Sequence, residues 1–252
     1  YAQAVDAARP AVNVGALIGH TALRMRHMPQ LDRAATPAER QAMAEDVRGA
    51  MEAGALGLSS GVFYKEAYAA DLDELVALAT AAARHGGVYA THIRDELMQI
   101  LPAMQEAAKT ARQAGLPLVL SHHKCAGAAN WGRTRETLAL VDEIGHKQPI
   151  SLDVYPYTAG STVLRSDLVD GVIDILITGS QPHPEMVGRY LKDIAQEWGV
   201  GEREACERLQ PGGACYFQMC EQDVERVIAH PKAMIGSDGL PHDERPHPRL
   251  WG

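Results

Sequence analysis

The chain has 252 residues, 46% of them hydrophobic, and a formal net charge of −8 at pH 7. This length and composition can bury the core of one large domain or two small ones. The negative charge and the lack of a dense Lys/Arg run argue against a nucleic acid or an anionic membrane as partner, and no apolar stretch reaches the roughly 18–20 residues that cross a bilayer.

The four cysteines, Cys125, Cys206, Cys215 and Cys220, show neither the density nor the spacing of a secreted disulfide scaffold. No secretory leader is visible, so we expect a cytoplasmic protein, although a chain that begins at Tyr1 could have lost one.

Apolar runs and helix-period segments alternate along most of the chain. A capping box over 36–39, with proline at the first helical position, predicts a helix that ends before Gly54. Further helices are expected over 71–85, 101–114, 134–145 and 221–229. The apolar runs predict strands at 14–19, 56–60, 87–92, 118–122, 150–155 and 233–238.

This alternation predicts a parallel sheet with helical crossovers, and six such strands without an antiparallel hairpin signal favour a TIM-like (β/α)8 barrel over an open sheet. About six strands cannot close an eight-stranded barrel, so the barrel is expected to be incomplete and the chain to be part of a longer polypeptide. The rhythm breaks after Tyr155, where a Gly/Pro-punctuated excursion holds one clear helix, about 184–198. We therefore expect a barrel portion over 1–156 and 218–252, and an insertion over 157–217 that covers the active-site face.

Two predicted strands end at a histidine, His92 and His122. Because the carboxyl ends of parallel strands share one face, both imidazoles are expected to point into one site, where they could bind zinc. Each histidine could instead simply cap its strand with a hydrogen bond.

The strand at 233–238 ends in Asp238, whose carboxylate could ligate the same ion. It could also accept a proton from water whose pKa a metal ion lowers to about 7, and later protonate a departing amine. The alternative is a turn cap in Ser-Asp-Gly. Lys124 and Arg249 could bind a substrate carboxylate, and the Tyr155 hydroxyl could polarise a carbonyl; surface solvation and packing are the alternatives.

Several of these motifs together resemble a known family. His92 in THIR, His122 in SHHK, Tyr155 and Ser161 in YPYTAGST, and GSDG followed by HPR around Asp238 and Arg249 look like the D-aminoacylases, or N-acyl-D-amino-acid deacylases, of the amidohydrolase superfamily. The resemblance extends from Val12 to the end of the chain, and the motifs occur in order on separate strand ends.

The resemblance implies that the barrel is of the metal-dependent hydrolase type. It also implies a zinc-dependent hydrolase that converts N-acyl-D-amino acids to a carboxylate and a free D-amino acid. It implies that His92 and His122 are ligands of one or two zinc ions, and that Asp238 is the general base and then the acid. It assigns Lys124, Tyr155 and Arg249 to the substrate's carboxylate and carbonyl, and it places Ser161 at the start of an insertion that covers the pocket.

The family's pattern also includes a His-x-His pair and a cysteine ligand that would lie upstream of Tyr1, so the resemblance implies an incomplete metal shell and a missing N-terminal segment as partner. Two other readings stay open: an amidohydrolase acting on a cyclic amide such as a hydantoin or dihydropyrimidine, and a non-catalytic truncated barrel. Arg165 could pair with an acidic substrate side chain, or be a surface residue.

Overall fold

The computed structural model describes residues 2–239, which divide into two compact units. The first unit comprises the residues up to His123 together with Thr137–Asp153 and Lys232–Met234. The second comprises Lys124–Glu136, Val154–Pro231 and, among the described residues, 235–239. The chain therefore passes from one unit to the other repeatedly.

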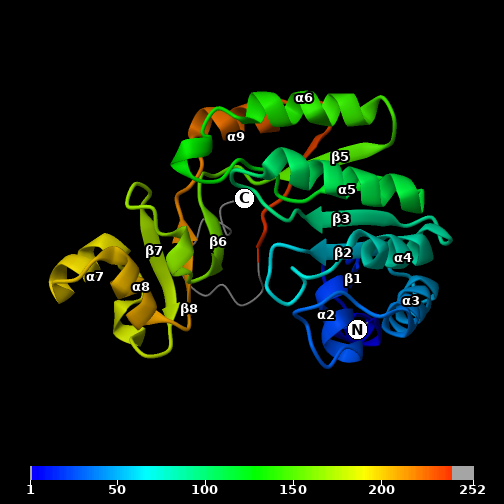
Figure 1. Cartoon of the computed structure of the whole chain (residues 1–252), viewed down its shortest axis with the longest axis horizontal. Helices are drawn as coiled ribbons and strands as arrows, with labels where there is room; N and C mark the ends of the chain where they lie inside the picture. Colours follow the sequence, from blue (N-terminus) through cyan, green and yellow to red (C-terminus); the bar gives the residue numbers. More distant parts are fainter. Residues whose placement is uncertain (1, 240–252) are drawn as a thin grey trace. The chain divides into compact units, whose positions relative to one another are not determined.

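A six-stranded sheet in the order β1-β2-β3-β4-β5-β9 organises the first unit (Figure 1). Its first five strands pair in parallel, each with the next along the chain. This confirms the predicted α/β class, because a parallel sheet with helical crossovers is the arrangement of an incomplete α/β barrel. The strands are β1 (Ile18–Gly19), β2 (Gly57–Gly61), β3 (Val88–His92), β4 (Leu118–Leu120), β5 (Ile150–Val154) and β9 (Ala233–Ile235).

Helices connect these strands, and α3 packs against α4 and α4 against α5. The predicted capping box at the start of α3 is present, with the Thr36 side chain accepting from the Glu39 N–H and Glu39 accepting from the Thr36 N–H. The helices are α1 (Ala2–Ala8), α2 (His20–His27), α3 (Pro37–Glu52), α4 (Leu72–Ala83), α5 (Ile100–Ala114) and α6 (Thr134–Gly145).

Three strands are at least two residues shorter than their apolar runs predicted. The first predicted strand keeps only Ile18–Gly19, and β9 ends at Ile235. β4 ends at Leu120 instead of reaching residue 122. The reason at β4 is visible in the backbone, because His122 has a φ of 40° and cannot continue an extended strand.

The second unit contains a three-stranded antiparallel sheet in the order β6-β8-β7 (Figure 1). The prediction of a single helix over 184–198 was wrong. That range holds a 3-10 turn at Pro184–Met186 and the helix α7 (Leu191–Trp198), and a further helix, α8 (Glu202–Leu209), follows it. The strands and α7 and α8 enclose an apolar core that includes Ile177, Leu191 and Tyr216. The elements are β6 (Gly160–Val163), β7 (Ile175–Ser180), α7 (Leu191–Trp198), α8 (Glu202–Leu209), β8 (Gly212–Tyr216) and α9 (Glu221–Ile228), with 3-10 turns at Ala128–Asn130 and Ser166–Leu168.

A buried ion cluster ties α2 to α4 in the first unit. Glu74 accepts hydrogen bonds from Arg24 Nη1 at 2.5 Å and from the Ala35 N–H at 2.8 Å, and it lies 2.8 Å from His20 Nε2. The side chains of His20, Arg24 and Glu74 are all fully buried. Burial alone would raise the pKa of Glu74, but these hydrogen bonds outweigh it and lower that pKa below its ordinary 4.5.

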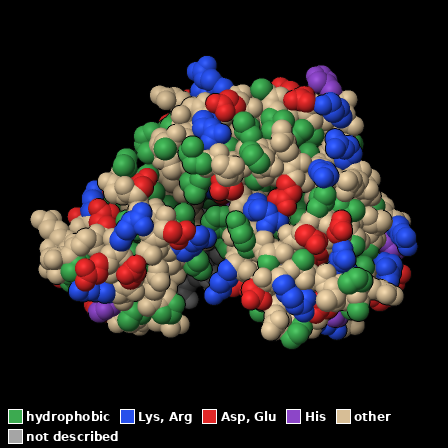
Figure 2. All heavy atoms as spheres, viewed as in Figure 1, with side chains coloured by type: hydrophobic (Ala, Val, Ile, Leu, Met, Phe, Trp, Pro, Cys, Tyr) green, Lys and Arg blue, Asp and Glu red, His purple; other side chains and the backbone are tan. Residues whose placement is uncertain are grey.

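On the face shown in Figure 2, acidic and basic side chains are interspersed over the surface of each unit. Many of them form exposed pairs, such as Lys147 with Glu143 at 2.7 Å. Within residues 2–239, no helix has the length and apolar character needed to span a membrane.

We expect Glu74→Gln to lower the free energy of unfolding at pH 7 by about 3–5 kcal/mol, because Arg24 would stay buried without its counter-charge. Glu74 has a lowered pKa in the folded state, so its contribution is fully present above pH 4.5 and is lost as the pH falls through the folded-state pKa. The stability difference between the two proteins, measured by urea unfolding, should therefore narrow below pH 4.5.

The matched control is Glu143→Gln, which removes one partner of the exposed pair with Lys147. Its free energy of unfolding should stay close to that of the wild type, because water screens an exposed ion pair. Equal effects of the two substitutions would contradict the importance of the buried cluster.

Candidate metal centre and active site

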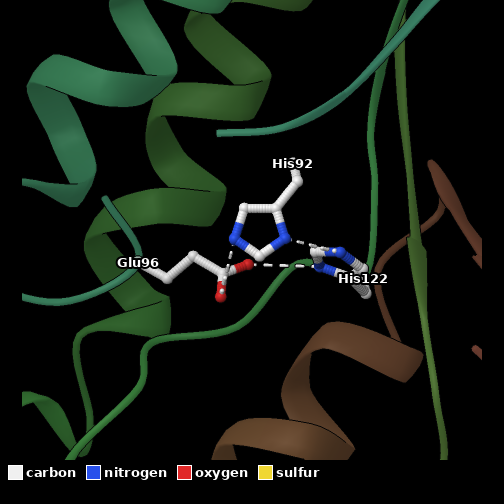
Figure 3. Close-up of side chains that lie close together, drawn as sticks. All are labelled: His92, Glu96 and His122. Carbon is white, nitrogen blue, oxygen red and sulfur yellow. Dashed lines mark hydrogen bonds and ion pairs between the residues drawn. The ribbon is translucent and has the colours of Figure 1, made fainter. Parts of the chain in front are cut away.

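His92 and His122 lie side by side in the first unit (Figure 3). His92 is the last residue of β3, and His122 follows the neighbouring strand β4. His92 Nδ1 and His122 Nε2 are 3.0 Å apart. The structure thus brings together the two histidines that the strand-end pattern singled out, while their role as metal ligands stays a prediction.

Glu96, which the sequence analysis did not identify, joins the two histidines. Its carboxylate lies 3.1 Å from His122 Nδ1 and 3.6 Å from His92 Nε2. The three side chains are 8–16% exposed, and within the described chain they form the group of side chains whose donor atoms are close enough to hold a metal ion. The sequence did contain a signal, since an acid four residues beyond a strand-end histidine occupies the same loop.

A hydrogen bond from the backbone N–H of His122 to the side chain of Asp153, on β5, fixes the position of His122. The His122 N–H donates to Asp153 Oδ1 at 2.7 Å, and the Ser121 hydroxyl donates to Asp153 Oδ2 at 3.2 Å. The His123 N–H also donates to the Asp153 carbonyl, at 2.8 Å. These bonds stabilise the positive φ of His122, a strained backbone of the kind that concentrates at functional sites.

Aromatic rings pack against His92. The ring centroids of Phe63 and Tyr64, which follow β2, lie 4.9 and 5.2 Å from that of His92. They limit access of water to the imidazole and restrict its orientation. His123, adjacent to His122 in sequence, has a different environment: it is buried, and its Nε2 lies 2.8 Å from the Thr137 hydroxyl.

The donor set fits a borderline divalent ion. Two imidazoles and a carboxylate are ligand types that zinc takes in proteins, with Zn–N distances of about 2.0–2.1 Å. Two nitrogens on a tetrahedral ion of that size lie about 3.3 Å apart, close to the 3.0 Å between His92 Nδ1 and His122 Nε2. A small rearrangement would therefore admit the ion between them.

Other predicted site residues belong to the second unit. Lys124 Nζ lies 5.6 Å from the centroid of the Tyr155 ring, within the range of a cation–π contact. Tyr155 stacks on Tyr157 at 4.3 Å, and the Tyr157 hydroxyl donates to the carbonyl of Ser237. Asp238 follows in the loop after β9 with a φ of 54°. Lys124 and Tyr155 are thus neighbours, and the catalytic role of Asp238 stays a prediction.

Of the remaining three candidates, Ser161 and Arg165 have separate surroundings. Ser161 lies on β6 with its hydroxyl 3.1 Å from Cys215 Sγ. Arg165 forms an ion pair with Asp167 at 2.5 Å, which lowers the pKa of Asp167. Arg249 lies outside the described residues. The substrate-binding roles of all three stay predictions.

The parallel sheet and the imidazole–carboxylate group at its strand ends define an incomplete α/β barrel with a candidate metal centre. Across its whole length, the chain is similar to the D-aminoacylase of Alcaligenes xylosoxydans xylosoxydans, at 47% identity over 100% of this chain and 52% of that protein. It is 46% identical to the N-acyl-D-aspartate deacylase (96% of this chain, 49% of the relative) and 44% identical to the N-acyl-D-glutamate deacylase (100% and 52%) of the same organism. The chain thus spans about half the length of these curated relatives, and no protein-family model matches it.

Solved structures give the same result. A D-aminoacylase described as defining a novel subset of amidohydrolases superposes with a TM-score of 0.95 at 48% identity, covering 100% of this chain and 53% of that one. The N-acyl-D-glutamate deacylase of Bordetella bronchiseptica, complexed with zinc and a phosphonate inhibitor, superposes with a TM-score of 0.95 at 46% identity, covering 99% and 53%. These similarities confirm the resemblance to D-aminoacylases and the α/β fold class.

The adjacent histidines provide a matched pair of variants. We expect His122→Asn to weaken Zn²⁺ binding by more than the roughly 10–100-fold typical of changes outside the ligand shell, because a nitrogen donor is lost. His123→Asn should leave the affinity within a few-fold, since His123 contacts Thr137 instead. Competition with a chromophoric chelator measures both affinities. Equal losses in the two variants would exclude His122 as a specific ligand.

Proposed function

We propose that the whole protein is a zinc-dependent hydrolase that converts N-acyl-D-amino acids to a D-amino acid and a carboxylate. The observation that carries this proposal is the cluster of His92, Glu96 and His122 at the ends of neighbouring parallel strands. It is supported by similarity over the full chain to D-aminoacylase and to a zinc-complexed deacylase. The chain contributes part of the site, and we propose that an N-terminal segment of the same polypeptide supplies further ligands and the rest of a (β/α)8 barrel.

A bound Zn²⁺ would act as a Lewis acid on the amide carbonyl and would lower the pKa of water to about 7. His92 and His122 would hold the ion, and the rings of Phe63 and Tyr64 against His92 would keep the donor region poorly solvated. Poor solvation strengthens the electrostatic interactions on which such a site depends.

The proton transfers are assigned to Asp238, which we also propose as an additional metal ligand. Its carboxylate accepts a proton from the attacking water and then donates it to the nitrogen of the departing amine. Lys124 and Arg249 bind the carboxylate of the substrate by charge, and the Tyr155 hydroxyl donates to the carbonyl on which negative charge develops. The contact between Lys124 and the Tyr155 ring supports a shared role for these two residues.

The segment 157–217 is proposed to cover the active-site face as an insertion, with the barrel portion formed by 1–156 and 218–252. Ser161 lies near the start of this segment, and we propose that it binds the substrate. A cytoplasmic location is proposed on the cysteine usage, since the four cysteines form no disulfide.

For the whole protein, we expect Asp238→Asn to lower kcat by at least about 10²–10⁴-fold, because the amide cannot exchange the proton. Metal content, measured by atomic emission, should stay close to that of the wild type, since the two imidazoles remain. Asp170→Asn is the control: Asp170 caps the backbone at Val172 and Ile173 in the same unit, and activity should not change. Undiminished turnover in the Asp238 variant would contradict the assignment.

Substrate preference separates the remaining possibilities. N-acetyl-D-methionine, N-acetyl-D-glutamate, their L-enantiomers and dihydrouracil should be compared by kcat/KM. We expect hydrolysis of the linear D-substrates, and turnover of dihydrouracil alone would favour a cyclic-amide hydrolase. If Arg165 pairs with an acidic side chain of the substrate, N-acetyl-D-glutamate is preferred and Arg165→Met removes that preference; a preference for the methionine substrate in the wild type contradicts this role.

A further inference from the structure

The two imidazoles face each other through one nitrogen each. These are Nδ1 of His92 and Nε2 of His122, 3.0 Å apart. The lone pairs of two metal-bound nitrogens converge on the ion, and we infer that these two nitrogens, already 3.0 Å apart, bind a single ion together. His92 would therefore bind through Nδ1 and His122 through Nε2.

The other nitrogen of each ring faces Glu96. His122 Nδ1 lies 3.1 Å from Glu96 Oε1, and His92 Nε2 lies 3.6 Å from Glu96 Oε2. Figure 3 shows the carboxylate and His122 at opposite edges of the His92 ring. The carboxylate is thus placed against the nitrogens that point away from the ion.

We propose that Glu96 is a positioning residue shared by both histidines rather than a third metal ligand. Glu96 Oε1 is placed to accept the N–H at His122 Nδ1, 3.1 Å away, and Oε2 lies 3.6 Å from the buried Nε2 of His92, just beyond hydrogen-bond distance. A shift of a few tenths of an ångström would let Oε2 accept the N–H at His92 Nε2. One side chain would then fix the tautomer and the orientation of two ligands. A carboxylate that accepts from a metal-ligating histidine is a known way to orient the ring and raise its basicity as a donor. This inference rests on the metal centre of the proposed function and not on its substrate.

The surroundings of Glu96 suit this role. The residue is 6% exposed, and a buried carboxylate is costly unless it accepts hydrogen bonds. Its backbone is fixed by a turn in which Asp95 Oδ1 accepts from the N–H groups of Leu97 and Gln99 at 2.8 and 2.9 Å. The turn leads directly into α5, so Glu96 extends from a hydrogen-bonded turn at the start of a helix.

The first test uses the whole protein, without substitutions, loaded with Zn²⁺. Long-range ¹H–¹⁵N NMR of the histidine rings should show His92 protonated at Nε2 and His122 protonated at Nδ1. The reverse assignment for either ring would overturn the inference, because a metal-bound nitrogen would then face Glu96. Failure to bind Zn²⁺ at all would also overturn it.

The second test separates a positioning residue from a ligand. Glu96→Gln keeps one acceptor oxygen and should weaken Zn²⁺ binding about 10–100-fold, while the visible spectrum of the Co²⁺-loaded protein keeps the band positions and intensity of the wild type. Glu96→Asp keeps both oxygens on a shorter side chain and should restore part of the affinity. A change of coordination number in the Co²⁺ spectrum of either variant would show that Glu96 is a ligand.

The matched control is Asp95→Asn, since its amide oxygen can still accept from Leu97 and Gln99. We expect wild-type metal affinity and wild-type tautomers in this variant, and a loss equal to that of Glu96→Gln would overturn the inference. These readouts do not involve substrate. A protein that fails to hydrolyse N-acyl-D-amino acids but shows the expected tautomers would contradict the proposed function and leave the role of Glu96 intact.

Discussion

The candidate site depends on the parallel pairing of β3 with β4. Neighbouring strands in a sheet lie about 4.8 Å apart, and in a parallel pair both carboxyl ends reach the same edge. The register pairs Tyr89 with Leu118 and Thr91 with Leu120. His92 and His122 therefore leave the sheet within reach of each other, although 30 residues separate them in the sequence. A slip in this register would separate the two imidazoles.

The sequence pattern predicted the order of strands and helices, because each of these elements is encoded by residues that are close together in the chain. Apolar runs bounded by Gly and Pro give the strands, and the capping box at Thr36 gives the start of α3. The antiparallel sheet was missed because β6 (GSTV) and β8 (GGACY) are short, start with Gly and show no clear alternation of apolar and polar residues. Helix α2 was missed for a different reason: its buried His20 and Arg24 are polar, so its inner face does not read as apolar.

Glu96 and Glu74 show why buried polar clusters are difficult to predict from the sequence. Both carboxylates are buried, and in the sequence both read as ordinary charged residues of a surface. Glu74 faces Arg24 and an N–H of a distant loop, whereas Glu96 faces two histidines from neighbouring strand ends. The first set of partners connects a helix to its neighbours, and the second surrounds a place for a cation. Only the fold shows which acid has which partners.

The bond from Asp153 to the main chain at residue 122 has a consequence for engineering. This bond and the positive φ hold the loop through the backbone, and neither requires an imidazole at that position. Aspartate and asparagine also tolerate the left-handed conformation. The side chain at position 122 can therefore be exchanged while the loop keeps its backbone conformation. A side chain with an oxygen donor at that position would shift the metal preference from borderline ions toward harder cations.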